Sequence, residues 1–207
     1  MERIKISGLY FLILVYVSGA IGFVMKPNFF MPLTPYSLLL TSVVFLLNQP
    51  LKEKKFYIAF CIISLIGFMV EAVGVKTGYL FGAYYYGNIL GIKLMNVPLI
   101  IAVNWALLIS SGSIVAQRIT DKKYYSAFIC ATVVTGIDFI MEQLAGKLDF
   151  WYFSGGKAGV QNYLAWFFIS FCTSLLFSNA LKNGNYKASI IVLTLQILFF
   201  GTIYTLI

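Results

Sequence analysis

Four acidic side chains lie inside or beside apolar stretches long enough to span a bilayer, and they are the residues best suited to chemistry. Glu71 lies near the end of one stretch, and Asp138 and Glu142 lie in another, with Asp149 a few residues beyond. A carboxyl group at membrane depth is costly and is therefore a candidate functional residue. The spacing of four residues puts Asp138 and Glu142 on one face of a helix.

Proton transfer is the chemistry that such a cluster supports. Neighbouring carboxylates repel one another, so we expect at least one of them to hold its proton. A protonated carboxyl can act as a general acid, or as one step of a proton relay in a transporter. The structural alternative is that each acid holds helices together through hydrogen bonds. A purely structural cluster would more often pair acids with bases, and no Lys or Arg lies at that depth.

Other kinds of site find little support in the sequence. Histidine is absent, and the three cysteines lie apart within apolar spans, where we expect small buried hydrophobes. There is no nucleophile beside a base, no phosphate-binding loop and no metal-ligand spacing of Cys or His. Clustered carboxylates could hold Mg²⁺, but nearby bases for a phosphorylated substrate are lacking. We therefore expect neither a metal nor a cofactor.

The composition is that of an integral-membrane protein. Of the 207 residues 60% are hydrophobic and 11% are charged, whereas a soluble domain is nearer half apolar and a quarter charged. We expect a single membrane domain over residues 1–207. The net charge of +8 comes from bases in short connectors between apolar segments, which is a topology signal. The expected surroundings are therefore a lipid bilayer, and nucleic acid is not an expected partner.

Seven apolar segments predict an all-α bundle of about seven transmembrane helices. The second is short and begins near two prolines. If the N-terminus is cytoplasmic, the cytoplasmic connectors carry ten Lys and Arg and the others five, which predicts a cytoplasmic N-terminus and a C-terminus on the outer side. We expect a multi-pass protein of the cell inner (cytoplasmic) membrane. The segments are 7–25, 33–48, 56–75, 97–117, 124–145, 162–181 and 187–207.

Helix rise places the polar groups in one slab below the outer face. Counted from the predicted helix ends, Glu71 lies at ~6 Å, Asp138 at ~10 Å and Glu142 at ~5 Å depth. Asn104 lies in the next predicted helix, ~10 Å deep from the same side. We therefore expect these side chains to converge in one pocket.

Two connectors, 76–96 and 146–161, are rich in glycine and aromatic residues, and with their flanks they resemble the two signatures of the membrane carotenoid biosynthesis family. That family contains the carotenoid 1,2-hydratases, among them bisanhydrobacterioruberin hydratase. The resemblance covers roughly residues 70–170. The first signature is matched by Glu71, Gly74, Thr77, Gly78, Phe81, Gly82, Tyr84, Tyr86, Leu90, Gly91, Pro98 and Trp105. The second is matched by Asp138, Glu142, Leu148, Asp149, Phe150, Trp151, Val160, Gln161, Asn162, Tyr163 and Trp166.

The resemblance implies a cofactor-independent hydro-lyase that acts on a hydrophobic isoprenoid substrate. The reaction is acid-catalysed hydration of the terminal C=C bond of an acyclic carotenoid to a tertiary alcohol. Asp138 is the candidate proton donor, and Glu142 or Glu71 would orient or deprotonate the water. The candidate substrate-binding residues face the cation with a ring, fix the water or border the substrate: Tyr84, Tyr86, Asn104, Trp105, Asp149, Trp151 and Asn162.

Three other functions remain open from the sequence. A small proton-coupled transporter would use Glu71, Asp138 and Glu142 as its relay, although inverted repeats, which would favour it, are not visible. A cyclase, or another isoprenoid-modifying enzyme, also begins by protonating an alkene. A non-catalytic membrane subunit is the third. The oligomeric state is left open.

Overall fold

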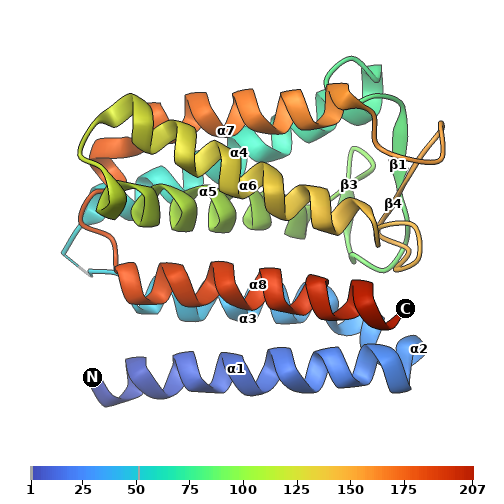
Figure 1. The fold of residues 1–207 in the computed structure, drawn as a ribbon, viewed down its shortest axis with the longest axis horizontal. Helices are drawn as coiled ribbons and strands as arrows, with labels where there is room; N and C mark the ends of the chain where they lie inside the picture. The colour runs from blue at the N-terminus through green and yellow to red at the C-terminus, as the bar shows by residue number, and fades with distance from the viewer. Residues whose placement is uncertain (1, 51) are drawn as a thin grey trace.

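Seven membrane-length helices dominate the described part of the protein (Figure 1). The computed structural model describes residues 2–50 and 52–207, with side chains from residue 8 onward. Each of the seven spans is long and apolar enough to cross a membrane, which confirms the predicted all-α multi-pass bundle. The long helices are α1 (Glu2–Met25), α3 (Thr34–Leu47), α4 (Lys54–Thr77), α5 (Leu99–Ile119), α6 (Lys123–Glu142), α7 (Val160–Leu181) and α8 (Tyr186–Leu206).

The orientation in the membrane stays a prediction. Lysines and arginines lie in the terminal turns of the helices or in the connectors between them, at both ends of the bundle. Arg3 and Lys5 contribute to the count of ten, and their side chains are not among those that the structure describes.

The second span is longer than the sequence predicted. A short helix α2 (Pro27–Phe30) and a 3₁₀ turn (Met31–Leu33) lead directly into α3, so that the span covers 21 residues from Pro27 to Leu47. Proline lacks the N–H that the first turn of a helix leaves unpaired, so prolines here begin the helical segments instead of breaking them.

Helix α5 is the centre of the bundle. It packs against α4, α6 and α7 on one side and against α3 and α8 on the other. In α5, 83% of the span is buried, compared with 22% in α1 at the edge (Figure 1). Small residues in α5 permit this close packing: a Cβ at Gly112 would lie 3.0 Å from Cys130 Sγ.

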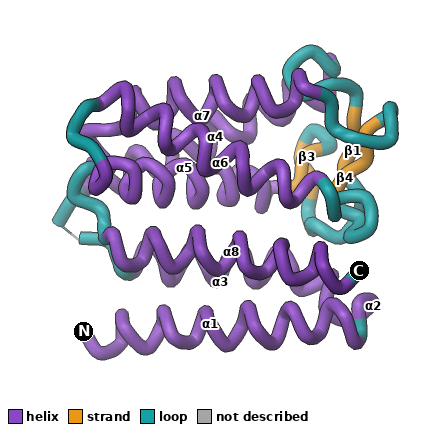
Figure 2. Tube along the Cα trace, viewed as in Figure 1, coloured by secondary structure: helices purple, strands orange, loops and turns teal. Residues whose placement is uncertain are grey.

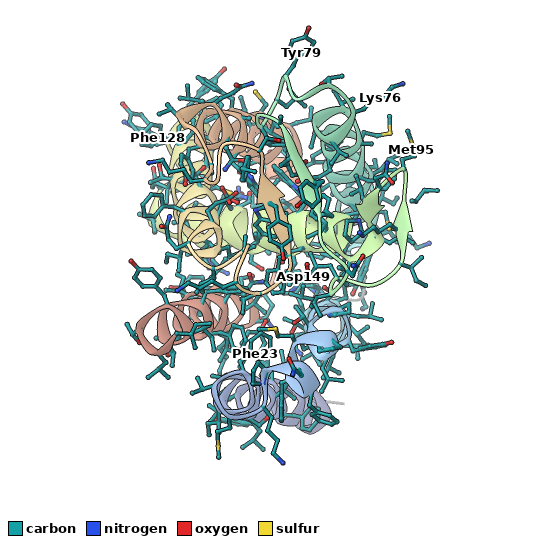
Figure 3. All side chains as sticks on the ribbon, turned by 90° about the vertical axis from the view of Figure 1, so that its right-hand side faces the viewer. Phe23, Lys76, Tyr79, Met95, Phe128 and Asp149 are labelled. Atoms are coloured by element: carbon teal, nitrogen blue, oxygen red, sulfur yellow. The ribbon has the colours of Figure 1, made fainter. Side chains whose placement is uncertain are left out.

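Two small antiparallel sheets, not predicted from the sequence, lie at the end of the bundle that carries the C-terminus (Figure 2). Strand β1 (Tyr84–Tyr86) pairs with β4 (Trp151–Phe153), and β2 (Lys93–Leu94) pairs with β3 (Val97–Pro98). The β1–β4 pair joins the two aromatic connectors, whose backbone groups would otherwise lie unpaired near the apolar phase. Seen end-on, this pair runs across the end of the bundle formed by α4 to α7 (Figure 3).

Two helix boundaries change the depths of the acids. Helix α6 ends at Glu142, not at residue 145, and α4 continues to Thr77. Counted from these ends, Glu71 lies at about 9 Å and Asp138 at about 6 Å, so the predicted order of their depths was wrong. No Gly or Pro marks the end of α6 before Gly146, and the chain leaves the helix through consecutive turns that begin with the Leu144 N–H bound to the Met141 carbonyl at 3.0 Å.

Candidate functional site

A small cavity lies between α4, α5, α6 and α7, directly beneath the β1–β4 pair. Its free space admits about one water molecule. We call it the site cavity. It is lined by Glu71, Phe81, Tyr84, Tyr86, Ile101, Asn104, Asp138, Met141, Glu142, Trp151, Phe153, Asn162 and Trp166.

The structure brings together eight of the ten candidate residues around this cavity, including all three candidate catalytic acids. The other two, Trp105 and Asp149, lie behind its wall and in the connector above it. No lysine or arginine lines the cavity.

Glu71 is buried and accepts three hydrogen bonds. Its Oε2 accepts from the hydroxyl groups of Tyr84 at 2.5 Å and of Tyr86 at 2.7 Å, and its Oε1 accepts from Trp105 Nε1 at 2.8 Å. An ionised carboxylate only accepts, and an indole N–H only donates. Three donors around one carboxyl group therefore fit the carboxylate form of Glu71.

Two glycines of α4 make room for the aromatic rings around Glu71. A Cβ at Gly67 would lie 2.5 Å from the Cβ of Trp105, and a Cβ at Gly74 would lie 2.5 Å from the ring of Phe81. Both positions face Glu71 along the helix, one turn away on either side. The spacing of small residue, acid and small residue therefore lets rings from α5 and the first connector reach the carboxylate.

Trp105 and Trp166 form a parallel stack at the floor of the site. Their ring centroids are 3.7 Å apart and their planes differ by 5°. Trp166 lines the cavity, whereas Trp105 lies behind it and binds Glu71. The ring that faces the cavity is therefore Trp166, to which the sequence assigned no role.

Asp138 and Glu142 share one amide. Asn162 Nδ2 donates to Asp138 Oδ2 at 2.9 Å and to Glu142 Oε1 at 3.2 Å. Glu142 Oε2 accepts from Trp151 Nε1 at 2.9 Å. Asp138 Oδ1 is different: it is buried and has no hydrogen-bond partner among the described residues. It is thus the carboxyl oxygen in the site that is available to a bound molecule.

Strands β1 and β4 form the aromatic roof of the cavity through the alternation of side chains in a strand. Tyr84 and Tyr86 point inward, opposite Phe153 and Trp151, while Tyr85 lies outside. Burial raises the pKa of the Tyr84 and Tyr86 hydroxyls above its usual range, and the neighbouring Glu71 carboxylate raises it further. Both hydroxyls therefore remain protonated donors.

Asp149 joins the two connectors outside the cavity (Figure 3). Its carboxylate accepts from the Asn88 backbone N–H and from the Tyr152 hydroxyl, each at 2.9 Å. The hydrogen bond to Asp149 raises the pKa of Tyr152. The backbone of Asp149 has φ = 54°, in the left-handed region. Asp149 lies so close to Gly87 that there is no space for a Cβ at position 87. Asp149 therefore shapes the roof.

A further amide approaches the site from α8. Gln196 Nε2 lies 3.5 Å from Asn104 Oδ1, and Gln196 Oε1 is buried with no partner among the described residues. Gln196 has no predicted role, although a glutamine is an unusual residue within the apolar run 187–207. Phe81, Ile101, Met141 and Phe153 also line the cavity without a predicted role; Phe153 could be found from the alternation of aromatic residues.

No metal site is visible at the acids. Within the described residues, no group of three or more His, Cys, Asp or Glu side chains is arranged to hold a metal ion.

The fold and the site define the protein as a multi-pass membrane protein with buried carboxyl groups around an aromatic cavity. Residues 33–207 match the model of a protein family described as "Carotenoid biosynthesis protein". This match covers more than half of the chain and every helix from α3 to α8, so the chain belongs to that family and its role is in carotenoid biosynthesis. No curated protein and no solved structure matches the chain.

Proposed function

We propose that the protein hydrates the terminal C=C bond of an acyclic carotenoid end group, with Asp138 as the proton donor. The observation that carries the proposal is the free Oδ1 of Asp138 at a cavity that takes about one water molecule. Hydration needs an acid and a positioned water in surroundings otherwise poor in water. The family supports the substrate class, an apolar isoprenoid.

The reaction would proceed in two balanced steps. Asp138 gives its proton to the less substituted alkene carbon, and the π electrons form the new C–H bond, which leaves a tertiary carbocation. The oxygen of a water molecule then bonds to the cation while Glu142 takes a water proton. That proton returns from Glu142 to Asp138, because both carboxyl groups bind the same amide, that of Asn162. The net change is the addition of one water molecule.

Glu71 would stabilise the cation electrostatically. Its oxygens are already occupied by three donors, so it is a weaker candidate for the base than Glu142. A negative charge held in place by hydrogen bonds favours a nearby cation without bonding to it. The faces of Trp166 and Phe153 at the cavity would add π-face attraction.

Isotope labelling tests this function. Membranes with and without the protein are given an acyclic carotenoid in heavy water or in oxygen-labelled water. Hydration predicts one labelled oxygen in the product and one carbon-bound deuterium on the neighbouring carbon. Conversion that leaves the oxygen label out of the product would contradict the proposal.

The alternatives give different label patterns. A cyclase would introduce deuterium on carbon without the oxygen label, because the ring closes on the cation. A proton-coupled transporter would leave the carotenoid unlabelled and would instead acidify or alkalinise the interior of sealed vesicles. The water-sized space beside Asp138 favours hydration over both.

A further inference from the structure

A larger apolar groove opens between α1, α3 and α8, on the side of the bundle away from α7. Its free volume is about 670 Å³, with its open mouth included. Figure 3 views the bundle from its connector end and shows Phe23, one of the residues of the groove, among these helices. We call it the membrane groove. It is lined by Val15, Tyr16, Ser18, Gly19, Phe23, Phe30, Leu33, Thr34, Ser37, Leu38, Gln196, Phe199 and Phe200.

The hydroxyl groups of this groove are already occupied. Ser18 donates to the Val15 carbonyl, Thr34 to the Met31 carbonyl and Ser37 to the Thr34 carbonyl. The Tyr16 hydroxyl accepts from Thr41 at 3.3 Å, and the remaining wall is aliphatic and aromatic, except for Gln196. The groove therefore offers an apolar ligand contact surface and offers a polar ligand little hydrogen bonding.

A middle cavity lies between the membrane groove and the site cavity. It shares Ile101, Asn104, Met141 and Trp151 with the site cavity. It shares Thr34, Leu38, Gln196 and Phe200 with the membrane groove. The three spaces thus form one row from the lipid-facing side of α1 and α3 to the free oxygen of Asp138.

The Gln196–Asn104 contact lies on this row. Gln196 borders the groove and the middle cavity, and Asn104 borders the middle cavity and the site cavity. The middle cavity is narrow, with space for about one water molecule. A chain would therefore pass from the membrane groove into the middle cavity by turning the side chains of Gln196 and Phe200, which border both of these spaces.

We propose that this row binds the isoprenoid chain of the substrate, with the terminal C=C bond at Asp138 and the rest of the chain leaving through the membrane groove into the bilayer. The inference rests on the proposed function for the position of the reacting end. It adds the route and a binding element, α1, which lies outside the family match over residues 33–207.

The chemistry of the row favours one occupant, a long, linear, uncharged hydrocarbon. None of its lining residues is Lys, Arg or His, and its only carboxyl groups lie at the reacting end. The β1–β4 pair covers that end from the outside, so a chain longer than the site cavity must extend in another direction. A lipid acyl chain could also enter the groove, but it would bring no terminal C=C bond of an isoprenoid to Asp138.

Plugging the groove tests the proposal. Gly19 lies on its wall, where a Cβ would meet the Phe199 ring at 3.4 Å, so Gly19→Leu would project into the groove. Ser37→Leu would plug it from α3. Gly201→Leu on α8 is the matched control, because its Cβ would meet nothing within 4 Å and Gly201 lines none of the three spaces.

Binding is measured by quenching of the tryptophan fluorescence of the purified protein in detergent. The chain has three tryptophans, and all three lie at the site. The probes are an acyclic carotenoid and a truncated polyene with the same end group. We expect each plug to weaken carotenoid binding by about tenfold or more, with less than about twofold change for the truncated probe, and Gly201→Leu to change neither.

The outcomes separate the route from the reaction. Unchanged carotenoid binding in both plugged variants would overturn the route, even if the wild type hydrates the carotenoid. Equal weakening of both probes would also overturn it, because the substitution would then act on the site and not on the chain. Binding of added phospholipid that the plugs weaken, with carotenoid binding unchanged, would overturn the route and assign the groove to lipid. Chain-dependent binding without any hydration would support the route and refute the proposed function.

Discussion

The three acids of the site should respond differently when each is changed to its amide, because their hydrogen-bond partners differ. In Asp138→Asn the new oxygen can accept from Asn162, and the new NH₂ group can occupy the place of Oδ1, which has no partner. We therefore expect a loss of stability below about 1 kcal/mol. An amide cannot donate a proton to an alkene, so conversion should fall by about 10²–10⁴-fold.

Glu71→Gln should behave in the opposite way. Both oxygens of Glu71 face donors, so an NH₂ group in place of either one meets an indole N–H or two tyrosine hydroxyls. A buried donor left unpaired costs about 1–3 kcal/mol, and the charge-assisted bonds are lost as well. We expect Glu71→Gln to lower the stability by about 2 kcal/mol or more.

The assay measures stability and conversion on the same preparations. Reversible unfolding in mixed detergent gives the stability, and pigment analysis of membranes with matched protein amounts gives the conversion of an acyclic carotenoid to its tertiary alcohol. Asp121→Asn is the control, since Asp121 is exposed at the opposite end of the bundle.

Three results would contradict parts of this reasoning. Equal destabilisation by Asp138→Asn and Glu71→Gln would show that the free oxygen of Asp138 does not make this residue more tolerant of an amide than Glu71. If Asp138→Asn converts normally while Glu142→Gln does not, the donor is misassigned. Normal conversion by all three amide variants would refute a hydratase that uses this cluster.

Three further outcomes follow from the packing, the buried tyrosines and the distribution of charge. Gly67→Ala should cost about 1–3 kcal/mol of stability, because its Cβ would lie 2.5 Å from the Cβ of Trp105. Gly136→Ala is the control and should not destabilise the protein, because its Cβ would meet nothing within 4 Å. Equal unfolding midpoints for the two variants would contradict this prediction. The raised pKa of Tyr84 means that, above its usual value of 10, the unfolded state releases a proton that the folded state keeps. Stability should therefore fall as the pH rises, by about 1.4 kcal/mol per pH unit for this group, and Tyr84→Phe should remove that part of the slope. Reporter domains fused after Lys54 and after Lys157 should lie on opposite sides of the membrane, and reporters on the same side would refute the predicted topology.

The seven spans could be predicted because a bilayer demands long apolar runs, whatever the tertiary contacts are. Helix ends are set more locally, and α6 shows the limit. It ends at Glu142 through turns that no glycine or proline announces, so the predicted end at residue 145 was three residues too far. That error, together with the extension of α4 to Thr77, reversed the predicted order of the depths of Glu71 and Asp138 without moving either residue from the connector end of the bundle.

That the three acids line one cavity could also be predicted, because all three lie near helix ends at the same end of the bundle. Their hydrogen-bond partners could not be predicted. The Tyr84 and Tyr86 hydroxyls reach Glu71 only because β1 pairs with β4 in one register, and these strands lie far apart in the sequence. A shift of one residue would turn both tyrosines outward.

The contribution of α8 was hidden for a different reason. Gln196 lies outside the stretch that carries the resemblance, and within its own helix it is only one amide in an apolar run. Its position beside Asn104 depends on how α8 packs against α5, which is a tertiary contact between helices separated by two others in the chain. Sequence patterns within one helix do not specify that contact.

On the proposed mechanism, the arrangement around Glu71 resolves a conflict between forming a carbocation and capturing it correctly. A free carboxylate would favour the cation, but it could also bond to it or remove a proton and regenerate an alkene. Three donors at 2.5–2.8 Å occupy the lone pairs of Glu71, so its charge remains while its basicity towards the substrate falls. Glu142, which receives only an indole N–H and a shared amide, is left as the base for the water. Removing donors from Glu71, for example with Tyr86→Phe, should therefore shift the products from the alcohol towards isomerised alkene, whereas a fall in total conversion at a constant product ratio would show that the donors serve only the fold.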